Sequence, residues 1–299
     1  MKHLIYFFIL FNLIFSTIDI KDKKNSDKPN PIQFGNIQLP KLSMSFESLM
    51  PEKNESTHTL LPFQIDEIKS KAKNYVPADI TNKDLIVIST NLGIIEFKFY
   101  NNESPENCLN FKKLANSKFY DKTLFHHIVP RYIIQGGDIL SRNDNPDDDG
   151  QGGPGWTVKQ EVSSLNHSRG TLSMIRGKDP NSAGSQFFIS LSENSNLDGQ
   201  YTIFAYLVSG DRFLSRISNI TTESQQAKML CTLDIPENEN KDDWIEVNDP
   251  LTGSTLFSKV PINEKKNNYR IAIQKKLNNI YRPGIPVIID SIRGIIDND

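Results

Sequence analysis

Short apolar runs separated by turn residues dominate the middle of the chain and predict a protein built mainly from strands. Residues 86–89 and 94–100 form the first two runs, and the Asn and Gly of the segment 90–93 suit a tight turn, so a hairpin is expected there. Further strands are predicted at 128–135, 171–174, 186–190 and 202–208. Because the strands are many and short and helices are few, this pattern favours a closed β-barrel.

One helix is predicted directly after the hairpin. Ser104 suits the N-cap position and Pro105 the first helical position, and Cys108, Phe111 and Leu114 then recur at helical spacing and are expected to face inward. With Cys231 as the only other cysteine, the chain has too few for a disulfide framework. We therefore interpret Cys108 as a small buried hydrophobe, in preference to half of a disulfide.

The N-terminal part of the chain is expected to lie outside this barrel. Residues 1–17 carry a short charged start and an apolar run, the pattern of a secretory signal peptide, which predicts export to a periplasmic, secreted or other extracytoplasmic compartment. The residues at the expected cleavage site fit only partly, so an uncleaved segment that tethers the protein to a membrane stays open as an alternative. Residues 18–83 are rich in Lys, Asn, Ser and Pro and are interpreted as a low-complexity tether, with one short amphipathic helix near residues 63–72 as a minority hypothesis.

Charge and composition narrow the classes of function. The chain has 34 basic and 36 acidic residues and a net charge of -2, so no strong field would recruit nucleic acid, and no nucleic-acid partner is expected. An apolar content of 37% is enough for a sizeable core. A monomer is expected.

Two blocks of the sequence carry the candidate chemistry. Residues 125–138 and 184–189 combine apolar residues with the amides of Gln135 and Gln186, aromatic side chains and glycines. These residue types suit a shallow apolar groove that hydrogen-bonds a neutral peptide backbone, and neither block has the pattern of a nucleophile or a metal cage.

In this order and at this spacing, the two blocks resemble the cyclophilin family of peptidyl-prolyl isomerases, and the closest similarity is to its bacterial branch. The resemblance covers residues 84–210 and resumes at 283–295, which is similar to the strand that closes a cyclophilin barrel. It implies a closed antiparallel cyclophilin-like barrel with about two helices over residues 84–299. Residues 221–282 then form an insertion before the last strand, interpreted as a surface loop because they contain few apolar residues to bury.

The resemblance also implies the roles of individual residues. His127, Gln135 and Tyr132 are the expected catalytic residues. Substrate binding is expected from Ile133, Ile175, Arg176, Gln186, Phe188, Leu197 and Tyr201. Rotation about an Xaa-Pro bond faces a barrier of about 18–20 kcal/mol, and a hydrogen bond to the prolyl nitrogen lowers it because that nitrogen becomes a better acceptor only in the twisted transition state. No cofactor is needed for this chemistry.

His127 occupies the position where the family usually has arginine, and this difference is expected to lower the rate of isomerisation. Imidazole is shorter, lacks the forked donor and is mostly neutral at pH 7. Loss of a charge-assisted hydrogen bond of about 1.5–3 kcal/mol predicts a rate lower by roughly ten- to hundredfold. A metal is not expected at His126 and His127, since neighbouring residues on a strand point to opposite faces.

The sequence therefore predicts a peptidyl-prolyl cis-trans isomerase that assists the folding of exported proteins and has proline-containing segments of unfolded polypeptides as partners. Two alternatives of the same fold stay open. One is a non-catalytic module that binds proline peptides, and the other is a scaffold in which the tether and the insertion bind a partner.

Overall fold

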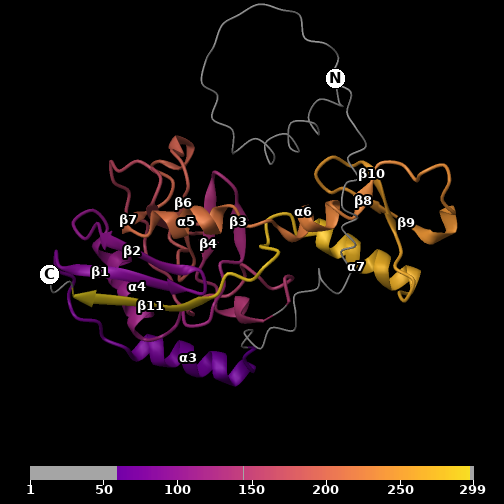
Figure 1. The fold of residues 1–299 in the computed structure, drawn as a ribbon. Helices are drawn as coiled ribbons and strands as arrows, with labels where there is room; N and C mark the ends of the chain where they lie inside the picture. The colour runs from indigo at the N-terminus through magenta and orange to yellow at the C-terminus, as the bar shows by residue number, and fades with distance from the viewer. Residues whose placement is uncertain (1–58, 144, 297–299) are drawn as a thin grey trace, which may run out of the picture. The chain divides into compact units, whose positions relative to one another are not determined.

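The structure is a computed structural model that describes residues 59–143 and 145–296, and its main feature is a curled antiparallel sheet of eight strands (Figure 1). The strands follow the order β11-β1-β2-β7-β5-β6-β4-β3 across the sheet. Their bounds are β1 Asp84–Thr90, β2 Gly93–Phe99, β3 His127–Val129, β4 Ile133–Gly136, β5 Thr171–Met174, β6 Phe187–Ser190, β7 Ile203–Ser209 and β11 Ile289–Ile296. The expected mainly-β antiparallel fold is confirmed.

The C-terminal strand, β11, pairs with the first strand of the sheet, β1. β11 pairs with β1 along its length, from Asp84 opposite Ile296 to Thr90 opposite Ile289. Just before β11, the amide of Phe125 donates to the carbonyl of Val287 at 2.9 Å, which links the β3 side of the sheet to the β11 side. The segment 283–296 is therefore an integral part of the barrel, as the sequence predicted.

Two helices cover the sheet. α4 (Pro105–Asn116) packs against β11 and β7, and α5 (Asp211–Ser218) packs against β2. Ser104 precedes α4, but its hydroxyl donates to the carbonyl of Ile203 at 2.9 Å instead of capping the helix. The carboxylate of Glu161 accepts from the first free helix amides, those of Glu106 and Asn107, at 3.1 and 2.9 Å.

The core of the barrel is rich in aromatic side chains. Phe111 lies 5.2 Å from Tyr120, 5.4 Å from Phe187 and 4.8 Å from Phe204, measured between ring centroids. All four side chains are fully buried. Cys108 is buried beside them and is not in a disulfide, as predicted, and burial raises the pKa of its thiol to about 12.

A helix lies within the range expected to be a tether. α3 (Pro62–Asn74) buries Ala72 completely, and the carbonyl of Lys73 accepts from the ammonium group of Lys113 in α4 at 2.8 Å. The side chains of Ile65 and Ile68 pack against the barrel core. The expectation of a tether is therefore wrong for residues 62–74, because the apolar side of this helix is long enough to dock. The signal peptide and the rest of the tether up to residue 58 lie outside the described residues.

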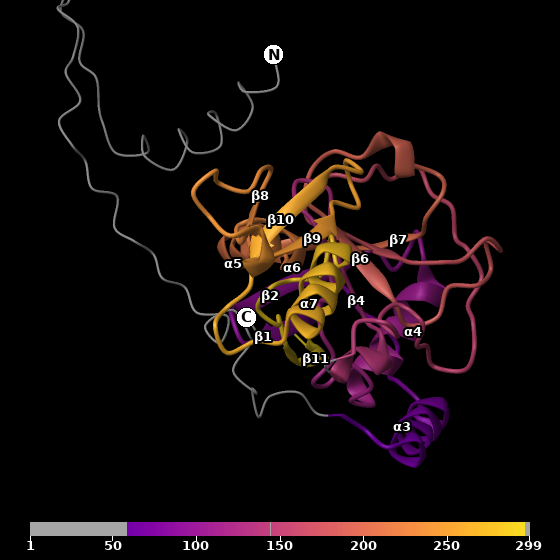
Figure 2. The same cartoon turned by 90° about the vertical axis from the view of Figure 1, so that its right-hand side faces the viewer.

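The insertion between α5 and β11 folds around a core of its own. Its elements are α6 (Glu223–Lys228), β8 (Cys231–Thr232), β9 (Trp244–Asn248), β10 (Thr255–Lys259) and α7 (Lys266–Asn278), with the strands in the order β8-β10-β9. Figure 2 shows α7 running beside this small sheet. The interpretation as a surface loop with little to bury was wrong, and residues 221–282 are called the insertion lobe from here on.

The few apolar residues of the insertion lobe suffice because they are placed periodically. Tyr269, Ile273 and Leu277 recur every four residues on one side of α7, where they meet Ile245 and Val247 of β9. The remaining buried members of this core are Ala227 and Leu256. No helix among residues 59–143 and 145–296 is long and apolar enough to cross a membrane.

Candidate active site

Three adjacent strands align the central residues of the candidate site. His127 of β3 pairs with Gln135 of β4, and Gln135 pairs with Phe188 of β6. Ile134, the neighbour of Gln135, is fully buried in the core. Because side chains alternate along a strand, Gln135 and Ile133 point to the outer face of the sheet. The structure thus brings His127, Gln135, Ile133 and Phe188 together, as the sequence predicted.

The two predicted glutamines make different hydrogen bonds. Gln186 donates through its amide nitrogen to the carbonyls of Gly150 and Gly152, both at 2.8 Å, and accepts from the amide of Gln135 at 3.1 Å. Gln186 is therefore committed to holding the glycine-containing segment. Gln135 makes no other side-chain hydrogen bond among the described residues, so its carbonyl oxygen and second N–H are available to a ligand.

Aromatic side chains surround Phe188, which is only 2% exposed. The ring of Phe188 meets Tyr201 edge-on at 5.5 Å and stacks on His167 at 5.7 Å, with 13° between the last two ring planes. The guanidinium of Arg176 lies 5.0 Å above the ring of Tyr201. The hydroxyl of Tyr132 accepts from the amide of Asn196 at 3.1 Å. Phe188 is thus held in place by aromatic neighbours on two sides.

His167 supports this group and was missed in the sequence. Its ring is buried, and Nδ1 lies 2.8 Å from Oδ1 of Asp198. Burial lowers the pKa of His167, although Asp198 acts in the opposite direction. No local motif marks this residue, because its partners Phe188 and Asp198 come from other parts of the chain.

The remaining predicted residues are Ile175, Arg176 and Leu197. Ile175 and Arg176 follow β5 and, with Gln186 and the segment 152–155, line a cavity of about 640 Å³. Leu197 ends the short helix η2 (Ser195–Leu197) and is half-buried. Lys69 of α3 also lines this cavity, so the N-terminal helix contributes to the surface around the site.

His127 does not face open solvent. Its ring lies 4.8 Å from the ring of Tyr281, and the amide of the next residue, Ile128, donates to the Tyr281 carbonyl at 2.8 Å. Burial lowers the pKa of His127 below its ordinary value. The neutral imidazole therefore predominates at pH 7, and it is flanked by the end of the insertion lobe.

The two neighbouring histidines face the same cavity, contrary to the sequence argument. His126 precedes β3, so strand alternation does not apply to the pair, and both rings line a cavity of about 340 Å³ together with Gln135. Within the described part of the chain, no group of three or more His, Cys, Asp or Glu side chains is placed to hold a metal ion.

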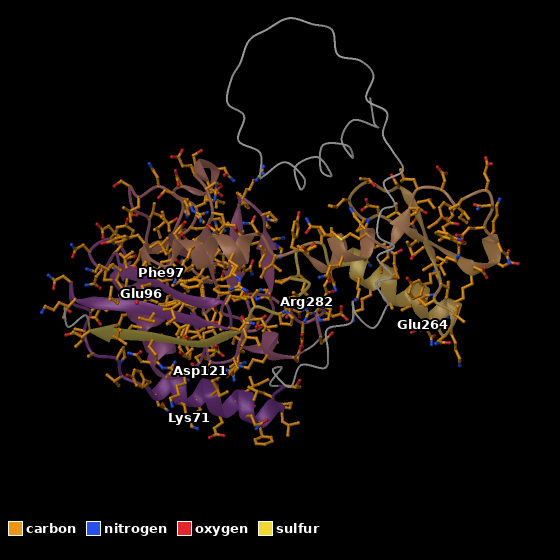
Figure 3. The ribbon with its side chains drawn as sticks, in the orientation of Figure 1. Lys71, Glu96, Phe97, Asp121, Glu264 and Arg282 are labelled. Carbon is orange, nitrogen blue, oxygen red and sulfur yellow. The ribbon has the colours of Figure 1, made fainter. Side chains whose placement is uncertain are left out.

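The end of the insertion lobe contributes residues that sequence reasoning missed. Arg282, labelled in Figure 3, lies 3.7 Å from the carboxylate of Asp149 and 3.6 Å from that of Glu223. Burial raises the pKa of Asp149 to about 7, and the positive charge of Arg282 only partly offsets this. The acidic segment 145–150 therefore places one buried carboxyl group against the insertion lobe.

The fold and the groove define a β-barrel protein with an amide-bearing apolar groove, and comparison with known proteins identifies its family. The family model described as "Cyclophilin type peptidyl-prolyl cis-trans isomerase/CLD" matches residues 85–235. A peptidyl-prolyl cis-trans isomerase of Acinetobacter baylyi is 35% identical over 146 residues, which cover 47% of this chain and 74% of that protein. Peptidyl-prolyl cis-trans isomerase B of Bacillus subtilis is 41% identical over 128 residues, covering 42% and 83%.

The chain therefore belongs to the cyclophilin-type peptidyl-prolyl cis-trans isomerase family, and its enzyme class is that of an isomerase. Among solved structures, a cyclophilin-type isomerase of Cryptosporidium parvum, crystallised in the presence of the dipeptide Ala-Pro, covers 71% of this chain and 98% of its own, with 26% identity and a TM-score of 0.47.

Proposed function

We propose that the groove around Gln135 and Phe188 catalyses cis-trans isomerisation of Xaa-Pro bonds, with His127 as a weakened donor. The observation that carries the proposal is the alignment of His127, Gln135 and Phe188 across three adjacent strands. This alignment supports the proposal because the ring of Phe188, which is 2% exposed, the carboxamide of Gln135 and the imidazole of His127 lie on the same side of the sheet. A proline ring, its flanking backbone and its nitrogen need these three kinds of group.

Each group has a distinct part in the proposed reaction. Phe188, Tyr201, Tyr132, Ile133 and Leu197 hold the proline ring. Gln135 binds the flanking backbone through the carboxamide atoms that no protein group occupies. The imidazole of His127 donates to the prolyl nitrogen as the amide twists, and this bond forms only in the transition state, so it raises the rate constant and not merely the affinity.

The His127 donor is expected to be weak. Burial lowers its pKa, so the charged imidazolium is scarce at pH 7. We expect His127→Arg to raise kcat/KM about tenfold or more in an NMR exchange or protease-coupled assay on a proline peptide, because a guanidinium donor is longer and always charged. His127→Gln serves as the matched control, since it offers an uncharged donor and should not raise the rate.

The pH profile tests the same role in the native protein. Because the pKa of His127 lies below 6.5, an imidazolium contribution should increase the rate as pH falls below about 6.5, and the Arg variant should be flat over that range. A flat profile in the native protein with unchanged activity in both variants would remove His127 from the mechanism.

A second candidate function is a non-catalytic module that binds proline peptides. It is favoured by the contact between His127 and Tyr281, which occupies one side of the imidazole. Peptide binding measured by chemical-shift perturbation, without exchange catalysis in the native protein or in His127→Arg, would select this alternative.

The proposed cellular role is to assist slow folding steps of exported proteins, and it rests on the signal-like sequence of residues 1–17. N-terminal sequencing of the native protein tests it. A start near residue 18 agrees with export through a cleaved signal, whereas Met1 retained in a membrane fraction makes this segment an anchor.

A further inference from the structure

The cavity beside His127 is shared between the barrel and the insertion lobe. It has a volume of about 340 Å³, which falls within the range of small-ligand sites. The barrel contributes His126, His127, Gln135, Asp149 and the segment around Gly150, and the insertion lobe contributes residues 278–282. Gln135 and His127 line this cavity and are also assigned to the peptide site under the proposed function, so the cavity adjoins that proposed site.

Buried polar atoms without hydrogen-bond partners line the cavity. His126 is 6% exposed; the backbone of Leu124 lies within hydrogen-bonding reach of its ring, but neither ring nitrogen meets the geometry of a full hydrogen bond among the described residues. Oδ1 of Asp149 and Nη1 of Arg282 also lack partners among the described residues, and Nη1 lies 3.7 Å from the other carboxylate oxygen, Oδ2, which is too far for a hydrogen bond. Buried groups of this kind are costly unless something pairs with them.

The charges around the cavity select against an ionic ligand. Arg282 contributes one positive charge, and Asp149 and Glu223 face it as carboxyl groups. Burial, with help from His127 and Arg282, lowers the pKa of His126 to about 4, so this ring is neutral at pH 7. An added carboxylate would face Asp149 and lie near Glu223, which pairs with Arg282 outside the cavity lining, and an added ammonium would face Arg282.

A neutral group that both donates and accepts hydrogen bonds can pair with the unpaired donor of Arg282 and with the unpaired acceptors of Asp149 and His126. A carboxamide has an oxygen for Nη1 of Arg282 and two N–H groups for Oδ1 of Asp149 and a ring nitrogen of His126. An apolar side chain would leave all of these atoms unpaired. A hydroxyl group has one donor only and cannot serve both acceptors.

We propose that this cavity is a substrate subsite that binds the carboxamide of a Gln or Asn residue within two positions of the proline being isomerised. The limit of two positions follows from the extended chain, which advances about 3.3–3.6 Å per residue, and from Gln135, which lines the cavity and is assigned to the peptide backbone under the proposed function. The inference rests on the proposed isomerase function and deepens it by naming a substrate class.

A peptide series tests the subsite in the full chain. Peptides carry Gln, norleucine, Glu or Lys at each of the two positions on either side of one proline, and NMR exchange gives kcat and KM for each. We expect Gln to exceed norleucine by about three- to tenfold in kcat/KM at one position, mainly through KM, with Glu and Lys no better than norleucine. Equal values for Gln and norleucine at every position overturn the subsite. Failure to isomerise any peptide overturns the isomerase function instead.

Two variants test whether the preference for Gln over norleucine arises in this cavity. Arg282→Met removes the donor at similar length and should abolish the advantage of Gln. Lys275→Met makes the same change of charge in the same lobe at a residue that does not line the cavity, and it should keep the advantage. If Arg282→Met fails to fold, Asp149→Leu removes the acceptor from the barrel side and should have the same effect. A preference that survives in every folded cavity variant contradicts the assignment.

Discussion

The barrel and the insertion lobe reach stability in different ways. The barrel buries a dense group of aromatic rings around Phe111 and surrounds them with eight paired strands. The hydrophobic core of the insertion lobe has seven buried residues around α7, among which Tyr269 is the only aromatic one, and Trp244 is buried outside this core. Its contacts with the barrel are largely polar, as in the ion pairs of Arg282 with Asp149 and of Lys275 with Asp147.

This difference indicates separate roles. Aromatic burial makes the barrel a rigid support for Gln135 and Phe188, and nothing in its core depends on the insertion lobe. The lobe instead places residues 278–282 beside His127, where they change the surroundings of the donor without taking part in the core of the barrel. The following predictions test this division, starting with the largest effect.

Deleting residues 283–299 should unfold the barrel, because it removes β11 and exposes the edge of β1. Replacing residues 221–282 by a short Gly-Ser bridge should leave the barrel folded, since the lobe has its own core. Cooperative unfolding followed by circular dichroism checks both variants. A bridged variant without a cooperative transition would show that the lobe is required by the barrel.

An alanine substitution in one core should lower the stability of that core and leave the other core unchanged. Phe111→Ala should lower the free energy of unfolding of the barrel by about 3–5 kcal/mol, because the cavity left behind cannot collapse. Leu277→Ala should cost about 2–5 kcal/mol but act on the insertion lobe alone. Amide hydrogen exchange resolved along the chain checks this, and loss of protection in β1 and β2 for Leu277→Ala would contradict two separate cores.

Asp149→Asn should stabilise the protein above neutral pH. Burial raises the folded-state pKa of Asp149 to about 7, while Arg282, Asp138, Asp148 and Glu223 also act on it. The folded protein therefore binds more protons than the unfolded chain between about pH 4 and pH 7, so the Asp149 contribution to stability falls as pH rises through this window. Since one pKa unit corresponds to about 1.4 kcal/mol, we expect a gain of at least roughly that size at pH 8.

The measurement is the difference in free energy of unfolding between Asp149→Asn and the native protein at pH 4, 6 and 8. The difference should grow with pH up to about 7 and then level off. His126, whose pKa is lowered to about 4, gives the opposite slope below pH 6.5, but it is present in both proteins and cancels. A difference that does not change with pH would contradict burial of an ionising carboxyl group.

Lys275→Ala should have the smallest effect. Its ion pair with Asp147 is 3.2 Å long, and both side chains are at least half exposed. Exposed pairs contribute about 0–1 kcal/mol and are screened by salt. Thermal unfolding at low and high salt should therefore show a change near the limit of detection, and a large loss would mean that this pair is a main attachment of the lobe.

By itself, the sequence determined the barrel and most of its groove. Local patterns were enough for the hairpin, for α4 and for β6, which carries Phe188, because period-two apolar runs and turn residues act over a few positions. The single strand expected at 128–135 was wrong, since β3 and β4 lie there with a turn at 130–132 between them. The resemblance of 283–295 to a closing strand agrees with β11, and the structure shows that β11 pairs with β1. Small apolar content was a poor guide for the insertion, where spacing along α7 counted more than number.

Only the tertiary structure decided what surrounds His127. Tyr281 and Arg282 lie far along the chain from His127, Asp149 and Gln135, and no local pattern relates them. His167 against Phe188 and Glu161 at the start of α4 have the same origin. Closing a long loop costs little additional entropy, so residues far apart in the sequence can meet in the fold. Polar groups buried where they meet then pair with one another. Their partners therefore follow from three-dimensional packing and not from spacing in the sequence.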